Sequence, residues 1–321
     1  MLQIGCGVVG SAYLQAFYEK GFNIVGCDLS TEQINMNLKK GLPCFHVDIV
    51  KEMHKDSFDY ILVSVPTPLD KKINSLDMKY IWSTLEMCAH VIKDDGVVFI
   101  RSTVPPGTTK EYENKLNESM NGEKNCHVLF NPEYLRARSA LDDARNPWLV
   151  TVGLSDKTLV PRIRNLFSYF TSSELVILNT EEAELQKLIH NYANAQKISF
   201  GNAVSAMVRD IGYEGKIDVP KVLITTTRTA ECYLNPRYGF KVVDSPFNGT
   251  CLTKDPHQLA SLANKGTAAY SFLQSTVDVN ASLRGTKYDN NVTTGYAWNP
   301  AITFQSNDVK DSGNKTQDAS F

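Results

Sequence analysis

Three glycines near the start of the chain, Gly5, Gly7 and Gly10, constrain its fold more than any other feature. They follow a short apolar run, Leu2–Ile4, and precede an amphipathic stretch, Ser11–Lys20, which is the strand–turn–helix context of a dinucleotide-binding turn. Glycines at this spacing allow a tight turn and bring the N–H groups of a helix N-terminus close to a pyrophosphate. The pattern predicts a Rossmann-like domain at the start of the chain.

Asp28 indicates which dinucleotide the domain binds. It lies at the end of the second apolar run, where a carboxylate can accept hydrogen bonds from ribose hydroxyls. The same carboxylate would repel a 2′-phosphate, and no Arg follows in Leu29–Thr31. We therefore predict that NAD binds here, with Val8 and Val9 beside its pyrophosphate. The alternative is a glycine-rich turn in a doubly wound fold without a nucleotide.

Short apolar runs alternate with helix-like stretches over the first 150 residues, which is typical of a parallel sheet covered by helices. The expected strands are Leu2–Ile4, Asn23–Cys27, Tyr60–Val65, Val97–Ile100, His127–Phe130 and Leu149–Val152.

A helical period then extends from Glu181 to Ile211, and Asp255-Pro256 predicts the start of a further helix that runs toward Ala281. The expected fold class is α/β: a Rossmann-like doubly wound parallel sheet (1–178), followed by an all-α domain built on a long central helix (179–282). Residues 283–321 are rich in Asn, Thr, Asp and Ser, and we expect a polar, disordered tail.

The composition excludes several classes of protein. Hydrophobic residues make up 42% of the 321 residues, enough for a sizeable core, and a formal charge of −2 provides no basic surface for nucleic acid or an anionic membrane. No apolar run reaches the length of about 18 residues that spans a bilayer. The seven cysteines include no Cys-x-x-Cys pair, so we expect reduced thiols and no metal site. A cytoplasmic enzyme without a signal peptide is the expectation.

Two groups of residues could carry chemistry. Lys187 and Asn191 are four residues apart on the predicted long helix and therefore share a face, where an amine and an amide can polarise or deprotonate a hydroxyl. A solvated helix face is the alternative. Cys251 precedes a predicted helix and has Lys254 three residues on, which predicts a lowered pKa and a nucleophilic thiol. Its alternative is a small buried side chain, and Asp255 could be only an N-cap.

Two polar segments, Ser102–Thr109 and Asn131–Arg136, follow predicted strands of the first domain. Ligands bind at the carboxyl ends of strands in such sheets, although both segments are also compatible with ordinary turns. The residues alone thus indicate an NAD-linked oxidoreductase whose reaction stays open.

Taken together, these segments resemble the UDP-glucose/GDP-mannose dehydrogenase family, the nucleotide-sugar 6-dehydrogenases. The resemblance covers residues 1 to about 265, and its landmarks run in the family's order: Ile4–Gly10, Val65–Pro68, Ser102–Thr109, Asn131–Leu135, the helix of Lys187 and Asn191, Pro236–Gly239 and Gly249–Asp255. It implies oxidation of a sugar C6 hydroxyl to a carboxylate with two NAD per turnover, in polysaccharide biosynthesis, with UDP-glucose as the first expected substrate. It also implies a homodimer formed through the long helix.

The resemblance further implies a role for each site residue. Lys187 and Asn191 would act on the alcohol with Asp255 and a water, and Cys251 would capture the aldehyde and become a thioester. Glu133 and Thr103 would position the hydrolytic water. NAD would contact Gly5, Gly7, Val8, Val9, Gly10, Asp28, Val65, Pro66, Thr67, Ser102, Thr103 and Lys254. The substrate would contact Glu133, Tyr134, Leu135, Arg136, Lys187, Asn191, Gly249 and Arg237, the last from the neighbouring subunit.

The chain departs from the family pattern at several positions. Pro246 and Asn248 replace two glycines before the cysteine, Thr253 stands where a Pro is usual, and Ala137 stands where a second Glu is common. Nothing after Ser282 resembles the third domain that binds the nucleotide of the sugar substrate in this family.

Two other functions stay open. A two-electron dehydrogenase of the β-hydroxyacid kind would use Lys187 and Asn191 without the thiol. A non-catalytic NAD-binding subunit would bind the dinucleotide and turn nothing over.

Overall fold

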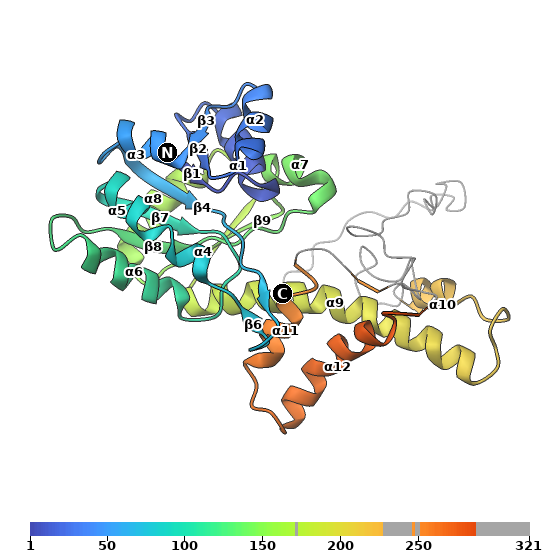
Figure 1. Ribbon diagram of the computed structural model, residues 1–321. Helices are drawn as coiled ribbons and strands as arrows, with labels where there is room; N and C mark the ends of the chain where they lie inside the picture. The colour runs from blue at the N-terminus through green and yellow to red at the C-terminus, as the bar shows by residue number, and fades with distance from the viewer. Residues whose placement is uncertain (171–172, 227–245, 248–250, 287–321) are drawn as a thin grey trace, which may run out of the picture.

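The computed structural model describes residues 1–170, 173–226, 246–247 and 251–286. An eight-stranded sheet with helices around it forms the first part of the chain, and a long helix, α9 (Thr180–Asp210), leads from it to a group of further helices (Figure 1). The predicted class, a Rossmann-like α/β domain followed by a helical region, is confirmed. None of the described helices is both long enough and apolar enough to cross a membrane.

The sheet has the strand order β3-β2-β1-β4-β7-β8-β9-β10. Its strands are β1 (Leu2–Ile4), β2 (Val25–Asp28), β3 (Cys44–His46), β4 (Phe58–Val63), β7 (Ile92–Ile100), β8 (His127–Phe130), β9 (Leu149–Gly153) and β10 (Glu174–Leu178). The first six strands in this order, β3-β2-β1-β4-β7-β8, are parallel. This is the order of two joined mononucleotide-binding halves. The strand order reverses between β1 and β4, so the carboxyl ends of these strands mark the expected ligand crevice.

Helices cover both faces of the sheet. They are α1 (Val8–Glu19), α2 (Thr31–Lys39), α3 (Val47–Met53), α4 (Lys79–Trp82), α5 (Leu85–Val91), α6 (Thr108–Ser119), α7 (Ala140–Arg145) and α8 (Val160–Phe167). Neighbouring residues of β7 show the two faces, because Phe99 packs into the core beneath α1 and α8 while Ile100 packs into the core beneath α5 and α6. Because successive side chains of a strand point to opposite faces, the residues of one apolar run contribute alternately to the two cores.

The helical region packs around α9. Its other described helices are α10 (Val219–Thr226), α11 (Asp255–Ser261) and α12 (Ala268–Ser282), and Leu188 and Tyr192 of α9 form a cluster with Leu259 of α11. The prediction of one helix from Asp255 toward Ala281 is wrong. The helix ends at Ser261, Gly266 adopts a left-handed φ of 86°, and the Thr267 side chain caps α12.

A small hairpin joins the two parts of the molecule. Its strands, β5 (Leu69–Asp70) and β6 (Ser75–Leu76), leave the sheet after β4 and reach α11. The Ser75 hydroxyl and the Leu76 N–H both donate to the side-chain oxygen of Gln258 at 2.7 Å. The start of α11 is therefore tied to the nucleotide-binding domain as well as to α9.

Candidate active site

The glycine turn after β1 has the shape that a dinucleotide requires. Gly5 has a φ of 80°, and a Cβ there would lie 2.5 Å from the Ser64 carbonyl oxygen; a Cβ on Gly10 would lie 1.8 Å from the Gly5 carbonyl oxygen. Gly7, by contrast, faces open space with no atom within 4 Å of a Cβ position. No side chain caps α1, so the N–H groups of its first turn, which begins at the exposed Val8, can point at an anion. The turn fits the pyrophosphate of NAD.

Asp28 lies beside this turn, at the carboxyl end of β2. Its carboxylate accepts hydrogen bonds from the backbone N–H of Cys6 at 2.7 Å and of Ser30 at 2.8 Å. The side chain is only partly buried, so its oxygens can also accept bonds from ribose hydroxyls. The position is the one that the sequence predicted.

The loops after β4 and β7 contain Val65–Thr67 and Ser102–Thr103, and hydrogen bonds hold them together. Ser102 donates to the carbonyl oxygen of Val65 at 2.6 Å, and the Thr67 hydroxyl donates to the carbonyl oxygen of Thr103 at 2.9 Å. The Lys254 ammonium lies 3.3 Å from the Thr67 hydroxyl. The predicted contacts to NAD from these loops thus share one edge of the sheet.

Lys187 is buried in this edge together with Glu133, which follows β8. Its side chain is 2% exposed; the ammonium donates to the Glu133 carbonyl oxygen and lies 3.3 Å from the carboxylate. Burial acts to lower the pKa of Lys187, but the surrounding Glu133, Cys251 and Asp255 raise it above its ordinary value. The alternative of a solvated helix face is wrong, and Lys187 is a cation at neutral pH.

Asn191 lies one turn further along α9 and donates a hydrogen bond to Asp255, whose side chain is fully buried. The other Asp255 oxygen accepts a bond from Lys254 at 2.7 Å. Asp255 is not the N-cap of α11, because Lys254 occupies that position. The spacing of four residues therefore aligns Lys187 and Asn191 with two buried carboxylates, one on each side of the domain boundary.

Cys251 lies next to these charges and is partly exposed. The prediction of a lowered pKa for its thiol is wrong: burial, together with Glu133 and Asp255, raises the pKa above its ordinary value, although Lys187 and Lys254 act in the opposite direction. The resting group is a thiol at neutral pH. Among the other cysteines that the structure describes, all are buried.

The remaining predicted substrate contacts follow β8. The Tyr134 hydroxyl bonds to Thr151 at 3.0 Å, and its ring lies 5.2 Å from the Lys187 ammonium. Leu135 packs against the core, and its N–H donates to Glu133 at 2.7 Å.

Arg136 donates from its guanidinium to both oxygens of Asp143, at 2.7 and 3.0 Å, so it supports the loop after β8. Arg237 and Gly249, both predicted to contact the substrate, lie outside the described residues, as does Asn248.

Arg101 was not expected in the site. Its guanidinium is buried at the end of β7, lies 3.6 Å from the centre of the Tyr13 ring and donates to Asn131. Its Nε has no hydrogen-bond partner among the described residues. An Arg that directly follows the apolar run Val97–Ile100 and directly precedes Ser102 was the available signal in the sequence.

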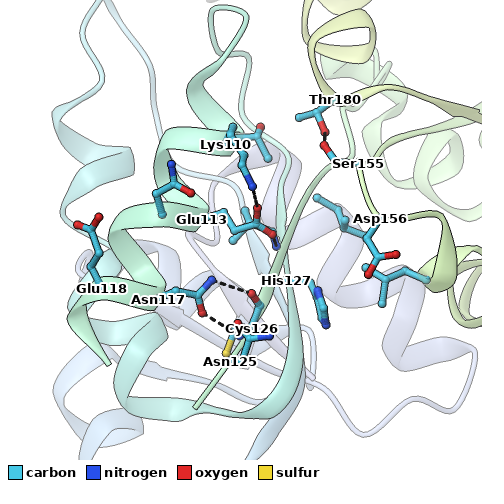
Figure 2. A pocket seen from close by; sticks show the side chains of 15 residues that line it. Lys110, Glu113, Asn117, Glu118, Asn125, Cys126, His127, Ser155, Asp156 and Thr180 are labelled. Atoms are coloured by element: carbon cyan, nitrogen blue, oxygen red, sulfur yellow. Dashed lines mark hydrogen bonds and ion pairs between the residues drawn. The ribbon is translucent and has the colours of Figure 1, made fainter. Parts of the chain in front are cut away.

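A cavity of about 460 Å³ lies elsewhere, between α6, β8 and the segment after β9 (Figure 2). The side chains that line it include two polar pairs: Lys110 bonds to Glu113 at 2.7 Å, and Ser155 lies 3.2 Å from Thr180 (Figure 2). None of the predicted site residues is among the described residues that line it. In the described part of the chain, no three His, Cys, Asp or Glu side chains gather to hold a metal ion.

Comparisons with known proteins agree with this geometry. Residues 44–171 match the NAD binding domain of the UDP-glucose/GDP-mannose dehydrogenase family, and residues 181–282 match the central domain of the same family. The chain is 28% identical to UDP-glucose 6-dehydrogenase of Campylobacter jejuni over 86% of its own length and 70% of that protein. It is 27% identical to UDP-glucose 6-dehydrogenase TuaD of Bacillus subtilis over 88% of its own length and 62% of that protein.

The fold is also that of a solved UDP-glucose dehydrogenase from the archaeon Pyrobaculum islandicum, with a TM-score of 0.72 at 23% identity over 88% of this chain and 67% of that one. The chain thus spans between 62% and 70% of these proteins. The match to the NAD binding domain confirms NAD as the predicted cofactor.

Proposed function

Because the chain belongs to the UDP-glucose/GDP-mannose dehydrogenase family of NAD-dependent oxidoreductases, we propose that it oxidises the C6 hydroxyl of a nucleotide sugar to a carboxylate. UDP-glucose is the substrate to test first, because the relatives named above are UDP-glucose dehydrogenases. The observation that carries the proposal is the buried group of Lys187, Asn191, Asp255 and Glu133 beside Cys251. These residues provide, within one site, groups that can act on an alcohol, on an aldehyde and on an acyl intermediate.

Lys187 and Asn191 serve the first oxidation. The raised pKa of Lys187 makes it a cation, so it stabilises the developing alkoxide and does not take the hydroxyl proton. That proton passes through a water to the Asp255 carboxylate, which Asn191 and Lys254 hold in place. NAD⁺, which the glycine turn and Asp28 would hold, would supply the hydride acceptor for each of the two oxidations.

Cys251 serves the second oxidation. Its sulfur forms a bond to the aldehyde carbon and the thiol proton passes to the carbonyl oxygen, which gives a thiohemiacetal. Loss of the C6 hydride and the hydroxyl proton leaves a thioester. Water then adds to the acyl carbon and the C–S bond breaks, which releases the acid and restores the thiol. Glu133 and Thr103, both buried at this edge, orient that water.

A homodimer formed through α9 completes the proposal. Apolar side chains along this helix are exposed in the single chain, among them Ile189 at 48% and Met207 at 50%. Burial of such a row against a second copy would be favourable. Light scattering on the wild type and on Met207→Lys tests this part, since the dimer predicts a smaller species for the variant.

The activity is tested by NADH formation at 340 nm with NAD⁺ and a panel of UDP-glucose, GDP-mannose and UDP-N-acetyl sugars. We expect two NADH per sugar consumed for one member of the panel, and loss of turnover in Cys251→Ser. Cys126→Ser is the matched control, because this buried thiol lies away from the site. One NADH per sugar with no effect of Cys251→Ser would favour the two-electron dehydrogenase. Binding of NAD without turnover of any member would favour the non-catalytic subunit.

A further inference from the structure

Glu184 is a buried carboxylate of α9 that the proposed chemistry does not use. It lies one turn before Lys187, on the same face of the helix, and is fully buried. Its oxygens accept three hydrogen bonds: from the N–H of Gly107 at 2.6 Å, from the N–H of Thr109 at 2.8 Å and from the Thr109 hydroxyl at 2.6 Å. All three donors belong to the start of α6.

Glu184 acts as the cap of α6 from another element. The N-cap of α6 is Gly107, which has a left-handed φ of 92° and offers no side chain to the free N–H groups. A carboxylate at this end of a helix satisfies those groups and interacts favourably with the helix dipole. Burial raises the pKa of Glu184, and the bonds from Thr109 and Gly107 act against that rise.

The segment that Glu184 fixes is the loop between β7 and α6, which carries Thr103. At its other end this loop is bonded to the loop after β4, through the Thr103 carbonyl oxygen and Thr67. From Thr67 the contacts continue through Lys254 to Asp255 and return to α9 at Asn191. This series of contacts therefore begins on α9 at Glu184 and ends on α9 at Asn191, two turns further along the helix.

The other contacts that fix α6 lie further along the helix. The 460 Å³ cavity runs along α6 from Thr109 to Glu118, and on this side Asn117 is hydrogen-bonded to the backbone of Cys126 at 3.0 and 2.9 Å (Figure 2). The opposite side packs through Tyr112 and Leu116 against the core. The carboxylate of Glu184 thus fixes the first turn of α6 to α9, in addition to the core cluster that contains Val104 of the loop and Ala183 of α9.

We propose that Glu184 is a positioning residue that holds the Ser102–Gly107 loop against α9 and so sets Thr103 relative to Lys187. Its importance for turnover depends on the proposed function, but its effect on the loop does not. Glu184→Gln keeps the size of the side chain and replaces one acceptor oxygen with an NH₂ group, which would face an N–H donor. Glu181→Gln is the matched control, since Glu181 is an exposed residue of the same helix turn.

The first measurement is amide hydrogen exchange of the peptide that contains Gly107 and Thr109, with the wild type and both variants. We expect exchange on the order of tenfold faster in Glu184→Gln, because a hydrogen bond to a charged acceptor is lost, and wild-type exchange in Glu181→Gln. Thr109→Val removes only the hydroxyl bond and should give a smaller acceleration. It serves as the second variant should Glu184→Gln fail to fold. Unchanged exchange in this peptide overturns the proposal, whether or not any sugar is oxidised.

The second measurement is steady-state kinetics on the substrate that the panel identifies. A positioning role predicts that Glu184→Gln lowers kcat on the order of tenfold while the KM for NAD⁺ changes less, because the glycine turn and Asp28 are untouched. If Glu184→Gln exchanged faster but had an unchanged kcat, Glu184 would be only a structural cap of α6, and the positioning role would be overturned. Absence of turnover in the wild type would instead refute the proposed function, and the exchange data would still decide the anchoring.

Discussion

Replacement of Lys187 by Met tests whether the centre of the site is a mutually dependent pair of buried charges. Met has a similar length and no charge, so the substitution leaves the volume nearly unchanged. It removes the ammonium that lies 3.3 Å from the Glu133 carboxylate and that donates to the Glu133 carbonyl oxygen. Glu133, itself 7% exposed, keeps a hydrogen bond from the Leu135 N–H at 2.7 Å.

The magnitude follows from this burial. Removal of one partner of a buried ion pair leaves the other charge uncompensated, which costs about 3–5 kcal/mol. Glu133→Gln should be costly for the same reason, because it leaves the Lys187 cation buried without its carboxylate. The double variant carries neither charge, so its loss of stability should be smaller than the sum of the two single losses by at least about 1 kcal/mol.

The assay is equilibrium unfolding in urea, followed by circular dichroism, for all four proteins of this double-mutant cycle. Additivity within about 0.5 kcal/mol would refute the pairing. The pH dependence gives a second check. Because the pKa of Lys187 is raised above 10.5, its contribution is complete at neutral pH. The difference in stability between the wild type and Lys187→Met should therefore shrink only as the pH rises through the raised pKa.

Three further outcomes follow from the site. Asp28→Ala should weaken NADH binding about 10- to 150-fold through loss of charge-assisted bonds to ribose, and an unchanged affinity in a fluorescence titration would contradict the placement of the cofactor. Gly10→Ala should prevent the turn from forming, because its Cβ would lie 1.8 Å from the Gly5 carbonyl oxygen, whereas Gly7→Ala should melt like the wild type but bind NADH more weakly. Alkylation of Cys251 by iodoacetamide, followed by mass spectrometry, should keep rising above pH 9.0, and a plateau near neutral pH would contradict the raised pKa.

The parts of the site that depend on local geometry could be predicted from the sequence. A spacing of four residues places Lys187 and Asn191 on one helix face wherever that helix packs, and the glycine spacing sets the turn after β1. The position of Gly266 before Thr267 also carried the signal that divides α11 from α12, a loop glycine followed by an N-cap, although the prediction passed over it.

What the sequence could not supply depends on contacts between distant segments. For Cys251 the local features, a helix start and Lys254, predicted a lowered pKa, but burial by other segments has the larger effect and the opposite sign. Strand β3 is equally non-local: Cys44–His46 is only three residues long, and it becomes a strand because its backbone pairs with β2 at the edge of the sheet.

Arg101 shows how such distant contacts prepare the site. A buried guanidinium is costly alone, and the groups that compensate it come from α1 and from the loop after β8: Tyr13 stacks on it and Asn131 accepts its hydrogen bond. Two residues further along that loop, Glu133 is bound by Lys187 of α9. The loop is thus fixed at one point by the sheet and at the next by the long helix. Movement of α9 relative to the sheet would therefore separate Glu133 from Lys187, so the interface between the two parts of the chain sets the geometry of the catalytic groups.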